Sequence, residues 1–329
     1  MRFKLASRAV IAGVAAALAL SACGSSETPA GPTTAANAGG LEKATIKMGA
    51  LPIPDSAALY IAKKRGFFKD EGLTVEIEPV AGGAQAQLGL MGGTFDATQT
   101  NYVSAFLAVS RGQKMKIISD LYQAAPNSFN LMVPKDSGIK TPANLKGKKI
   151  AVNSKQNIGT LAVTTVLKTH GLTEKDVEFV EFSFPEMGAQ LANKTVDAAW
   201  MTEPALTAAQ KKIGAQKLAD TMVDSTADFP IAGVAVTEKF ATENPKTVAA
   251  FQRAIAKAQQ IAATDRKAVE EILPDYTQID AATAAVITLG AFPTSLDETR
   301  LQRVADLMLE QGYLTSPIEA KTILPGNLG

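Results

Sequence analysis

The chain has 329 residues, a formal net charge of +1, one cysteine and one histidine. A single cysteine excludes a disulfide within the chain, and the sequence has no Lys/Arg-rich patch of the kind that a nucleic-acid binder needs. About 290 residues follow the N-terminal segment, enough for two domains with hydrophobic cores. We see no repeat and no internal linker rich in Gly, Ser or Pro, so two lobes, if present, are joined intimately.

The N-terminal segment has the pattern of a secretory signal peptide over residues 1–22. Three basic residues and no acidic residue precede residues 9–22, an uncharged run that ends in small residues. The run is too short for a transmembrane helix, which needs about 20 apolar residues. The motif LSAC, ending at Cys23, resembles the lipobox of bacterial lipoproteins, in which the cysteine is lipidated. The alternative is an ordinary signal peptide followed by an incidental free cysteine.

The lipidated Cys23 and a flexible tether are expected over residues 23–42. The segment after Cys23 is small and polar, and it cannot bury enough surface to offset its ordering entropy. Removal of the signal peptide leaves the mature chain at a net charge of −2, because three basic residues are lost. The lipobox resemblance implies a body held by acyl chains on the extracytoplasmic side of the cell membrane.

Alternating strands and helices are expected over the first part of the body. Ser56 or Asp55 is the expected N-cap of the first helix, and Gly66 its stop. The alternation predicts a parallel α/β sheet. The expected strands are 44–50, 73–79, 95–99 and 115–123, and the expected helices are 55–66, 85–93 and 101–112.

A second α/β series follows from residue 129, and the chain then becomes almost wholly helical. The two α/β units are predicted at 44–134 and about 136–232, with strands near 131–134 and 232–237 as candidates for crossings between them. The expected strands are 129–133, 148–154, 177–183, 196–201 and 231–238, and the expected helices are 158–171, 204–214, 245–265 and 295–312.

Four stretches of the body together resemble a known family. They are LYIAKKRGFFKDEGLTVEIEPVAGG, MGGTFDATQ, IKTPANLKGKKIAVNS and LANKTVDAAWMTEPAL. They resemble the solute-binding proteins of ABC importers for nitrate, sulfonates, taurine and thiamine-pyrimidine precursors. The resemblance covers roughly residues 45–240, and the order of the stretches behind a lipobox makes it specific, although no single motif is decisive.

The resemblance implies an α/β, two-lobed fold like that of type II periplasmic binding proteins, with two hinge strands, a ligand cleft and a helical C-terminal region. Lobe 1 would comprise 43–134 plus 236–329, and lobe 2 would comprise 135–235. The protein would bind a small solute by hinge closure and deliver it to the ABC permease and ATPase subunits. It is expected to be a monomer, with no cofactor, no metal and no nucleic-acid partner.

Five loops are the expected location of the ligand site. In open α/β sheets, ligands bind beyond the carboxyl ends of the strands, where helix N-termini offer unpaired N–H groups. The loops are 51–56, 82–85, 99–102, 153–160 and 200–204. The candidate ligand-binding residues are Pro52, Asp55, Ser56, Gly83, Gln85, Thr100, Asn101, Tyr102, Asn157, Ile158, Gly159, Thr160, Trp200, Glu203 and Phe229.

A structural role is the alternative for several of these residues. Asp55 and Ser56 can be explained as helix caps, and Thr or Asn after a strand as turn chemistry. Trp200, the only tryptophan, can be core rather than an aromatic wall. Glu203 can bind a ligand amine or be a solvated loop charge. Gly159 favours a functional interpretation, because glycine permits close backbone approach.

Chemistry for an enzyme is not evident in the sequence. His170 is expected to end a helix beside Gly171, a capping arrangement, without a neighbouring acid or cysteine to build a catalytic or metal site. No nucleophile elbow, Walker A loop or metal-ligand cluster is present. The alternatives to a binding protein for transport are a surface receptor or adhesin that kept the fold, and an enzyme related to pyrimidine synthases.

The loops also rank the ligand classes that the resemblance suggests. They carry one basic residue, Lys155, so a doubly charged phosphate has no bidentate clamp. Asp55 and Glu203 favour a ligand with an amine or amidine-like edge, and aromatic residues suit a ring. A taurine-like zwitterion or an aminopyrimidine-like compound therefore ranks first, a simple alkanesulfonate next and nitrate last.

Overall fold

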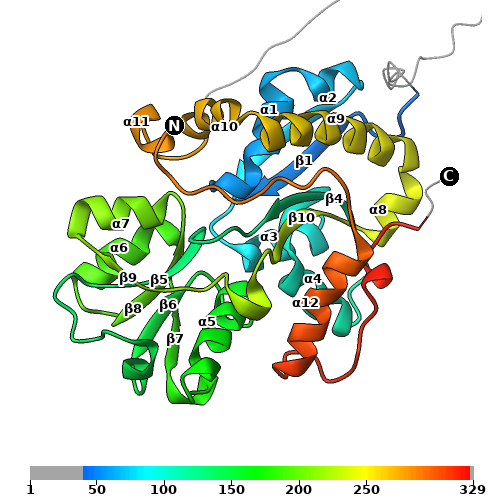
Figure 1. Ribbon diagram of the computed structural model, residues 1–329. Coiled ribbons are helices and arrows are strands. Elements are labelled where there is room, and N and C mark those ends of the chain that lie inside the picture. The colour runs from blue at the N-terminus through cyan, green and yellow to red at the C-terminus, as the bar shows by residue number, and fades with distance from the viewer. Residues whose placement is uncertain (1–39, 327–329) are drawn as a thin grey trace, which may run out of the picture. The chain divides into compact units, whose positions relative to one another are not determined.

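The structure, a computed structural model, describes residues 40–326 (Figure 1). Two five-stranded sheets organise this part of the chain, and each has its own helices. The expected signal peptide, Cys23 and most of the expected tether lie outside the described residues. Among the helices of residues 40–326, none combines the length and the apolar character needed to span a bilayer.

The first sheet is the basis of lobe 1. It contains β1 (Thr45–Ala50), β2 (Thr74–Pro79), β3 (Ala97–Asn101), β4 (Met115–Gln123) and β10 (Pro230–Thr237). The strand order is β2-β1-β3-β10-β4. β1 pairs in parallel with β2 and β3, whereas β10 runs antiparallel to both β3 and β4.

The second sheet is the basis of lobe 2 and repeats this plan. It contains β5 (Phe129–Val133), β6 (Lys149–Val152), β7 (Glu178–Glu181), β8 (Ala198–Thr202) and β9 (Gln216–Asp220). The strand order is β7-β6-β8-β5-β9. β6 pairs in parallel with β7 and β8, and β5 runs antiparallel to β8 and β9.

Both sheets are therefore mixed, whereas the sequence pattern predicted parallel pairing. The antiparallel strand in each sheet is the one by which the chain arrives from the other lobe, so it enters its sheet from the opposite end. The strands predicted to cross between the lobes lie later in the sequence than the segments that connect the two sheets. β5 pairs along its length with two strands of the second sheet, and β10 with two strands of the first. The connections between the sheets are therefore 124–128 and 221–229.

Most of the helices pack against the first sheet or against one another beside it. Figure 1 shows α9 lying alongside α1 and α2. The lobe 1 helices are α1 (Ala57–Lys64), α2 (Phe67–Asp70), α3 (Gly83–Met91), α4 (Tyr102–Ser110), α8 (Glu238–Glu243), α9 (Pro245–Thr264), α10 (Arg266–Ile272), α11 (Ala281–Ala284) and α12 (Glu298–Glu310). The lobe 2 helices are α5 (Ile158–Thr169), α6 (Phe184–Ala192) and α7 (Ala205–Ile213).

Short 3₁₀ helices complete the described chain. They are η1 (Pro54–Ser56), η2 (Pro142–Leu145), η3 (Glu174–Asp176), η4 (Asp224–Thr226), η5 (Leu273–Asp275) and η6 (Ala320–Thr322). η1 leads directly into α1, and Ser56 stands at the N-cap position without a side-chain capping bond. The expected capping role is thus not seen, because the Ser56 hydroxyl is bonded elsewhere, to Leu51 and Gln99.

The cores of both lobes follow from the central position of a few strands. Every residue of β5 and β8 is buried, and so are all residues of β10 except the last. Strands covered on both faces are expected to be apolar throughout, which explains the continuous apolar runs in the sequence. Two helix ends also match expectation, since Gly66 follows α1 in the left-handed conformation and His170 is the C-cap of α5.

A stretch of the C-terminal region lies against the junction of the two sheets. Ala291 and Gln123 exchange backbone hydrogen bonds of 2.9 Å at the end of β4. The Gly290 amide donates to the Tyr122 hydroxyl. We call residues 288–291 the strap, because they add a third chain segment to the two connections between the lobes.

Candidate functional site

A cavity of about 30 Å³ is lined by residues of both lobes. It has room for about two water molecules, at about 10–15 Å³ for each. Sites for small organic solutes have volumes of about 300–1,000 Å³, so a larger solute requires the lobes to move apart. The lining residues are Leu51, Ile53, Asp55, Gly83, Gln99, Thr100, Asn101, Phe129, Asn153, Ile158, Phe184, Trp200, Ile231 and Ala232.

The cavity brings together part of the set that the sequence analysis selected. Six of the selected residues line it, namely Asp55, Gly83, Thr100, Asn101, Ile158 and Trp200. Nine do not, namely Pro52, Ser56, Gln85, Tyr102, Asn157, Gly159, Thr160, Glu203 and Phe229. Ligand contact stays a prediction for all fifteen residues, and the closed cavity favours the first six.

Asp55 is the acidic member of the lining. It lies in η1, is 2% exposed, and its Oδ1 atom has no hydrogen-bond partner. Burial raises the pKa of Asp55 from 3.8 to about 7, and a bond from its own backbone offsets this only in part. An ionised carboxylate is costly to bury without a partner. The Asp55 side chain therefore favours either the protonated form or a hydrogen-bond donor beside its Oδ1 atom.

Three aromatic rings from lobe 2 form the opposite wall. Trp200 in β8 stacks on Phe129 with ring centroids 5.2 Å apart and planes 12° from parallel. Phe184, at the start of α6, packs at 5.9 Å from Trp200 in a tilted arrangement. The indole Nε1 of Trp200 donates to Thr221 over 2.9 Å. Trp200 therefore lines the cavity, while its polar edge is satisfied within the lobe.

Gly159 supports this wall from behind. A Cβ atom at Gly159 would lie 2.6 Å from the Trp200 ring. The close approach that glycine permits is therefore an approach of α5 to Trp200. This explains the glycine through packing, without a ligand.

A pair of asparagines joins the two lobes beside the cavity. Asn101 caps α4 by accepting from the Ser104 amide, and Asn157 caps α5 by accepting from the Ile158 amide. The Asn101 Nδ2 group also donates to Asn157 Oδ1 over 2.9 Å, and Asn157 Nδ2 donates to the Ser104 hydroxyl. Each of these helix N-termini therefore has one backbone amide bonded to its own cap.

Glu203 faces away from the cavity and bridges the lobes. Its carboxylate accepts from the amide and the hydroxyl of Thr207 and, across the lobes, from the Thr288 amide of the strap at 3.2 Å. Burial raises its pKa, and the Thr207 and Thr288 amides oppose the rise. The side chain is 1% exposed, so the alternative of a solvated loop charge is wrong.

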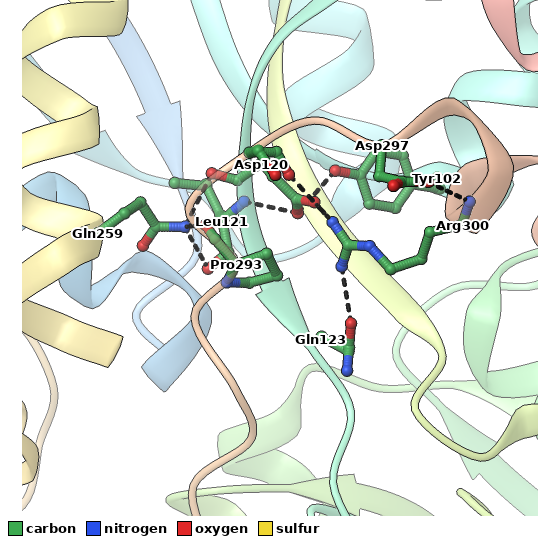
Figure 2. A network of polar contacts seen from close by, with 9 residues as sticks. Tyr102, Asp120, Leu121, Gln123, Gln259, Pro293, Asp297 and Arg300 are labelled. Carbon is green, nitrogen blue, oxygen red and sulfur yellow. Dashed lines mark hydrogen bonds and ion pairs between the residues drawn. The ribbon is translucent and has the colours of Figure 1, made fainter. Parts of the chain in front are cut away.

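Tyr102 belongs to a polar network around Asp120 of β4 in the first sheet (Figure 2). Its hydroxyl donates to Asp120 over 2.8 Å, and Arg300 of α12 pairs with Asp120 and donates to Gln123 at the end of β4. Gln259 of α9 donates to the carbonyl groups of Asp120 and Leu121. Burial raises the pKa of Asp120 to about 6 even beside Arg300. The network ties α9 and α12 to the strand that leaves lobe 1.

The other selected residues have local roles in this conformation. Gln85 is exposed and accepts from the Ala81 amide. Thr160 completes the capping box of α5 with Asn157. Phe229 is fully buried, and its carbonyl group accepts from Ala124 where the two connections meet. Pro52 is partly buried next to the cavity residue Leu51. No cluster of metal-ligating side chains occurs within residues 40–326.

Sequence reasoning did not select eight of the fourteen residues that line the cavity. Gln99 lies inside β3, one residue before the residues that were selected, and its Oε1 accepts from the Leu51 amide and the Ser56 hydroxyl. Phe184 begins a helix that was not expected. Asn153 follows β6 directly, within a loop that was selected, so its position could have been found from the strand end.

The family match covers most of the described chain. The model of the family described as NMT1/THI5 like matches residues 53–268. The chain belongs to this family. All residues that line the cavity, except Leu51, lie within the matched segment of the NMT1/THI5-like family.

Curated relatives are similar over part of their length. The putative binding protein YtlA of Bacillus subtilis is 24% identical over 206 residues, covering 62% of this chain and 61% of YtlA. The nitrate/nitrite binding protein NrtA of Nostoc sp. is 26% identical over 286 residues, covering 80% of this chain and 64% of NrtA. The aligned part of the chain thus spans less than two thirds of either relative.

Solved structures match nearly end to end. The alkanesulfonate-binding protein SsuA from Xanthomonas axonopodis pv. citri superposes with a TM-score of 0.72 at 19% identity, over 86% of this chain and 98% of SsuA. The desulfurization enzyme DSZB superposes at 0.64 and 17% identity, over 87% of this chain and 97% of DSZB. At these identities the likeness shows the fold alone, and the predicted two-lobed, periplasmic-binding-protein-like architecture is confirmed.

Proposed function

We propose that this NMT1/THI5-like protein is the extracytoplasmic solute-binding component of an ABC importer. The observation that carries the proposal is a cavity lined from both lobes of a two-lobed fold, with a buried carboxyl group among its lining residues, one oxygen of which has no hydrogen-bond partner. YtlA, NrtA and SsuA are all named as binding proteins, which supports the same role. Its partners would be the permease and ATPase subunits, and it would act as a monomer.

Capture of the solute would proceed by closure about the connections 124–128 and 221–229. In the open state the solute enters between the lobes, and in the closed state contacts such as Asn101–Asn157 form around it. The solute would be a small polar organic compound, sulfonate- or taurine-like or aminopyrimidine-like. The expected lipid on Cys23 would hold the protein at the outer face of the cell membrane.

The proposed function can be tested with the one tryptophan of the chain. Trp200 is 1% exposed in this closed conformation. In an open conformation the cavity that Trp200 lines would widen and admit water, so solute binding is expected to change its emission and to raise the melting temperature by mass action. A solute that binds by calorimetry, yet changes neither the emission nor the radius of gyration from X-ray scattering, would contradict closure.

Catalysis is the second candidate, because the desulfurization enzyme DSZB shares the fold. The sequence contains one histidine and one cysteine. His170 is exposed at the C-terminus of α5, and it does not line the cavity. Cys23 precedes the described residues. Incubation of the protein with a bound solute, followed by mass spectrometry of the solute, separates the two functions, since a binding protein releases it unchanged.

A further inference from the structure

A second contact between the lobes lies outside the cavity lining, between α5 and the end of α12. Figure 1 shows α12 beside α5, and the Gln311 Nε2 group donates to the Thr165 hydroxyl over 3.1 Å. Tyr313 follows two residues later and also lies against α5. Both residues lie beyond the matched family segment, which ends at residue 268. We call the contact of Gln311 and Tyr313 with α5 the outer contact.

The turn that ends α12 positions these two side chains. Gly312 has a positive φ of 80°, and the Tyr313 amide donates to the Met308 carbonyl over 2.8 Å. Glycine adopts this left-handed conformation at a helix end with little strain. The chain therefore leaves the helix axis directly after Gln311, the C-cap residue, and Tyr313 is placed beside Thr164 of lobe 2.

Three polar atoms are buried at the outer contact without a hydrogen bond. Burial raises the pKa of Tyr313 to about 12, and the neighbouring hydroxyls of Thr160 and Thr164 oppose the rise. The Tyr313 Oη and Thr164 Oγ1 atoms, one from each lobe, are nevertheless unpaired, and so is Gln311 Oε1. Buried polar atoms are paired in the great majority of cases, so three exceptions at one contact need a physical explanation.

The threonines of α5 differ in how their hydroxyls are used. Thr160 makes its hydrogen bonds within the capping box of α5. Thr165 donates to the Leu161 carbonyl, one turn back, and accepts from Gln311. Thr164 is 3% exposed and makes neither kind of bond. Its hydroxyl would be paired by water if the lobes moved apart.

Closure of the lobes therefore has opposing effects at the outer contact. The bond from Gln311 to Thr165 favours the closed state by about twofold to tenfold, the net worth of a typical hydrogen bond. Each buried polar atom without a partner disfavours the closed state by about fivefold to a hundredfold. Three such atoms outweigh one bond, so the contact as a whole destabilises the closed state.

We propose that the outer contact opposes closure, so that Tyr313 and Thr164 set the affinity for the solute without touching it. The inference rests on the proposed function, in which the lobes close on a solute. The apparent affinity of a ligand that binds the closed state is proportional to the fraction of molecules that are closed. Removal of these two hydroxyls should therefore strengthen the binding of any solute that the closed cavity holds.

Two identical substitutions at adjacent positions test the proposal. Thr164→Val removes a hydroxyl without a partner and keeps the side-chain shape, so it should raise the ratio of closed to open molecules by about fivefold or more. Tyr313→Phe should act in the same direction. Thr165→Val is the matched control, because it removes the acceptor of Gln311 and should lower the ratio by about twofold or more. A general folding defect does not give opposite signs at neighbouring positions.

The ratio is measured without a solute, from the distance between two spin labels on the full chain. Lys69→Cys in α2 and Lys168→Cys in α5 place one exposed label on each lobe, and Cys23→Ser leaves these as the only thiols. Double electron–electron resonance resolves open and closed molecules as two distance populations. Where the parent is almost wholly closed, Thr164→Val is added to Thr165→Val, and the same rise is expected there.

The outcomes separate this inference from the proposed function. More closed molecules in Thr164→Val and fewer in Thr165→Val support it. If Thr164→Val and Tyr313→Phe leave the ratio unchanged, or shift it toward the open state, these hydroxyls are paired in the closed state, and the inference is overturned while hinge motion stands. One population at one distance in the parent and in every variant would contradict hinge motion, and with it the proposed function.

Discussion

The two lobes contribute different chemistry to the cavity that they share. Lobe 1 supplies most of the polar side chains, with Asp55, Gln99, Thr100 and Asn101, whereas lobe 2 supplies all three rings. The polar groups of lobe 1 come from η1 and β3, whereas in lobe 2 Phe129 and Trp200 stack and Phe184 packs beside Trp200 at a tilt. The comparison teaches that lobe 1 contributes mainly polar side chains to the cavity and lobe 2 mainly aromatic ones.

The largest effect is expected from breaking the ring wall. Trp200→Ala removes a fully buried indole that contacts Phe129, Phe184 and Gly159. We expect the free energy of unfolding to fall by about 3–5 kcal/mol. Urea unfolding followed by circular dichroism measures it, with Trp200→Phe as a milder control. A loss below about 1 kcal/mol would mean that the wall is not packed as described.

Asp55→Asn, on the polar side of the cavity, should raise the free energy of unfolding, whereas Trp200→Ala lowers it. The raised pKa of Asp55, about 7 instead of 3.8, means that the folded state holds this proton more tightly than the unfolded state. Stability from this group is therefore complete below about pH 4 and is lost as the pH rises through about 7. Asp55→Asn should not show that loss.

The predicted gain of Asp55→Asn over the parent protein is up to about 4 kcal/mol at pH 8. It should shrink steadily between pH 7 and pH 4. Urea unfolding of both proteins over this pH range, without solute, gives the difference directly. A difference that does not vary with pH would show that Asp55 is not held protonated by its surroundings.

The contact of Asn101 with Asn157, which we call the seam between the lobes, should have a smaller effect on the free energy of unfolding. Asn101→Ala and Asn157→Ala each remove a helix cap, at about 1 kcal/mol, and each breaks the hydrogen bond between them. The double variant should cost less than the sum of the single variants by about 1 kcal/mol. Strict additivity in the ligand-free protein would indicate that the lobes are apart in solution and that this contact forms on closure.

Solvent-exposed contacts between the lobes, which we call the rim, should have the smallest effect on the free energy of unfolding. Arg111 donates to Gln156 over 2.7 Å, and both side chains are exposed. Arg111→Ala is expected to change the free energy of unfolding by less than about 0.5 kcal/mol. If this variant instead matched the loss of Asn157→Ala, the division between a buried seam and a solvated rim would be incorrect.

The element order of the fold was accessible from sequence, because periodicity reports burial. The alternation of residues 73–79 and the apolar stripe of α9 both led to correct elements. The crossing positions were not accessible. The apolar run 129–133 is compatible with either sheet, and only its pairing with β8 and β9 assigns it to lobe 2.

The candidate site was accessible where it follows from strand ends. Asp55, Thr100 and Asn101 were selected for that reason, and the closed cavity includes them. Side-chain direction was not accessible in the same way. Glu203 follows β8 as expected, yet it points to the strap. Phe184 has the sequence character of an ordinary core residue, so nothing local distinguished it as part of the wall.

The strap and Arg300 place a limit on how far the chain could be shortened. A fragment that stops at residue 268, where the recognisable family segment ends, would keep every cavity-lining residue. It would lose the strand partner of Gln123, the strap amide that donates to Glu203, and the cation beside the buried Asp120. Removing one partner of a buried ion pair costs about 3–5 kcal/mol. The minimal folded unit therefore extends through α12, well past the last residue that lines the cavity.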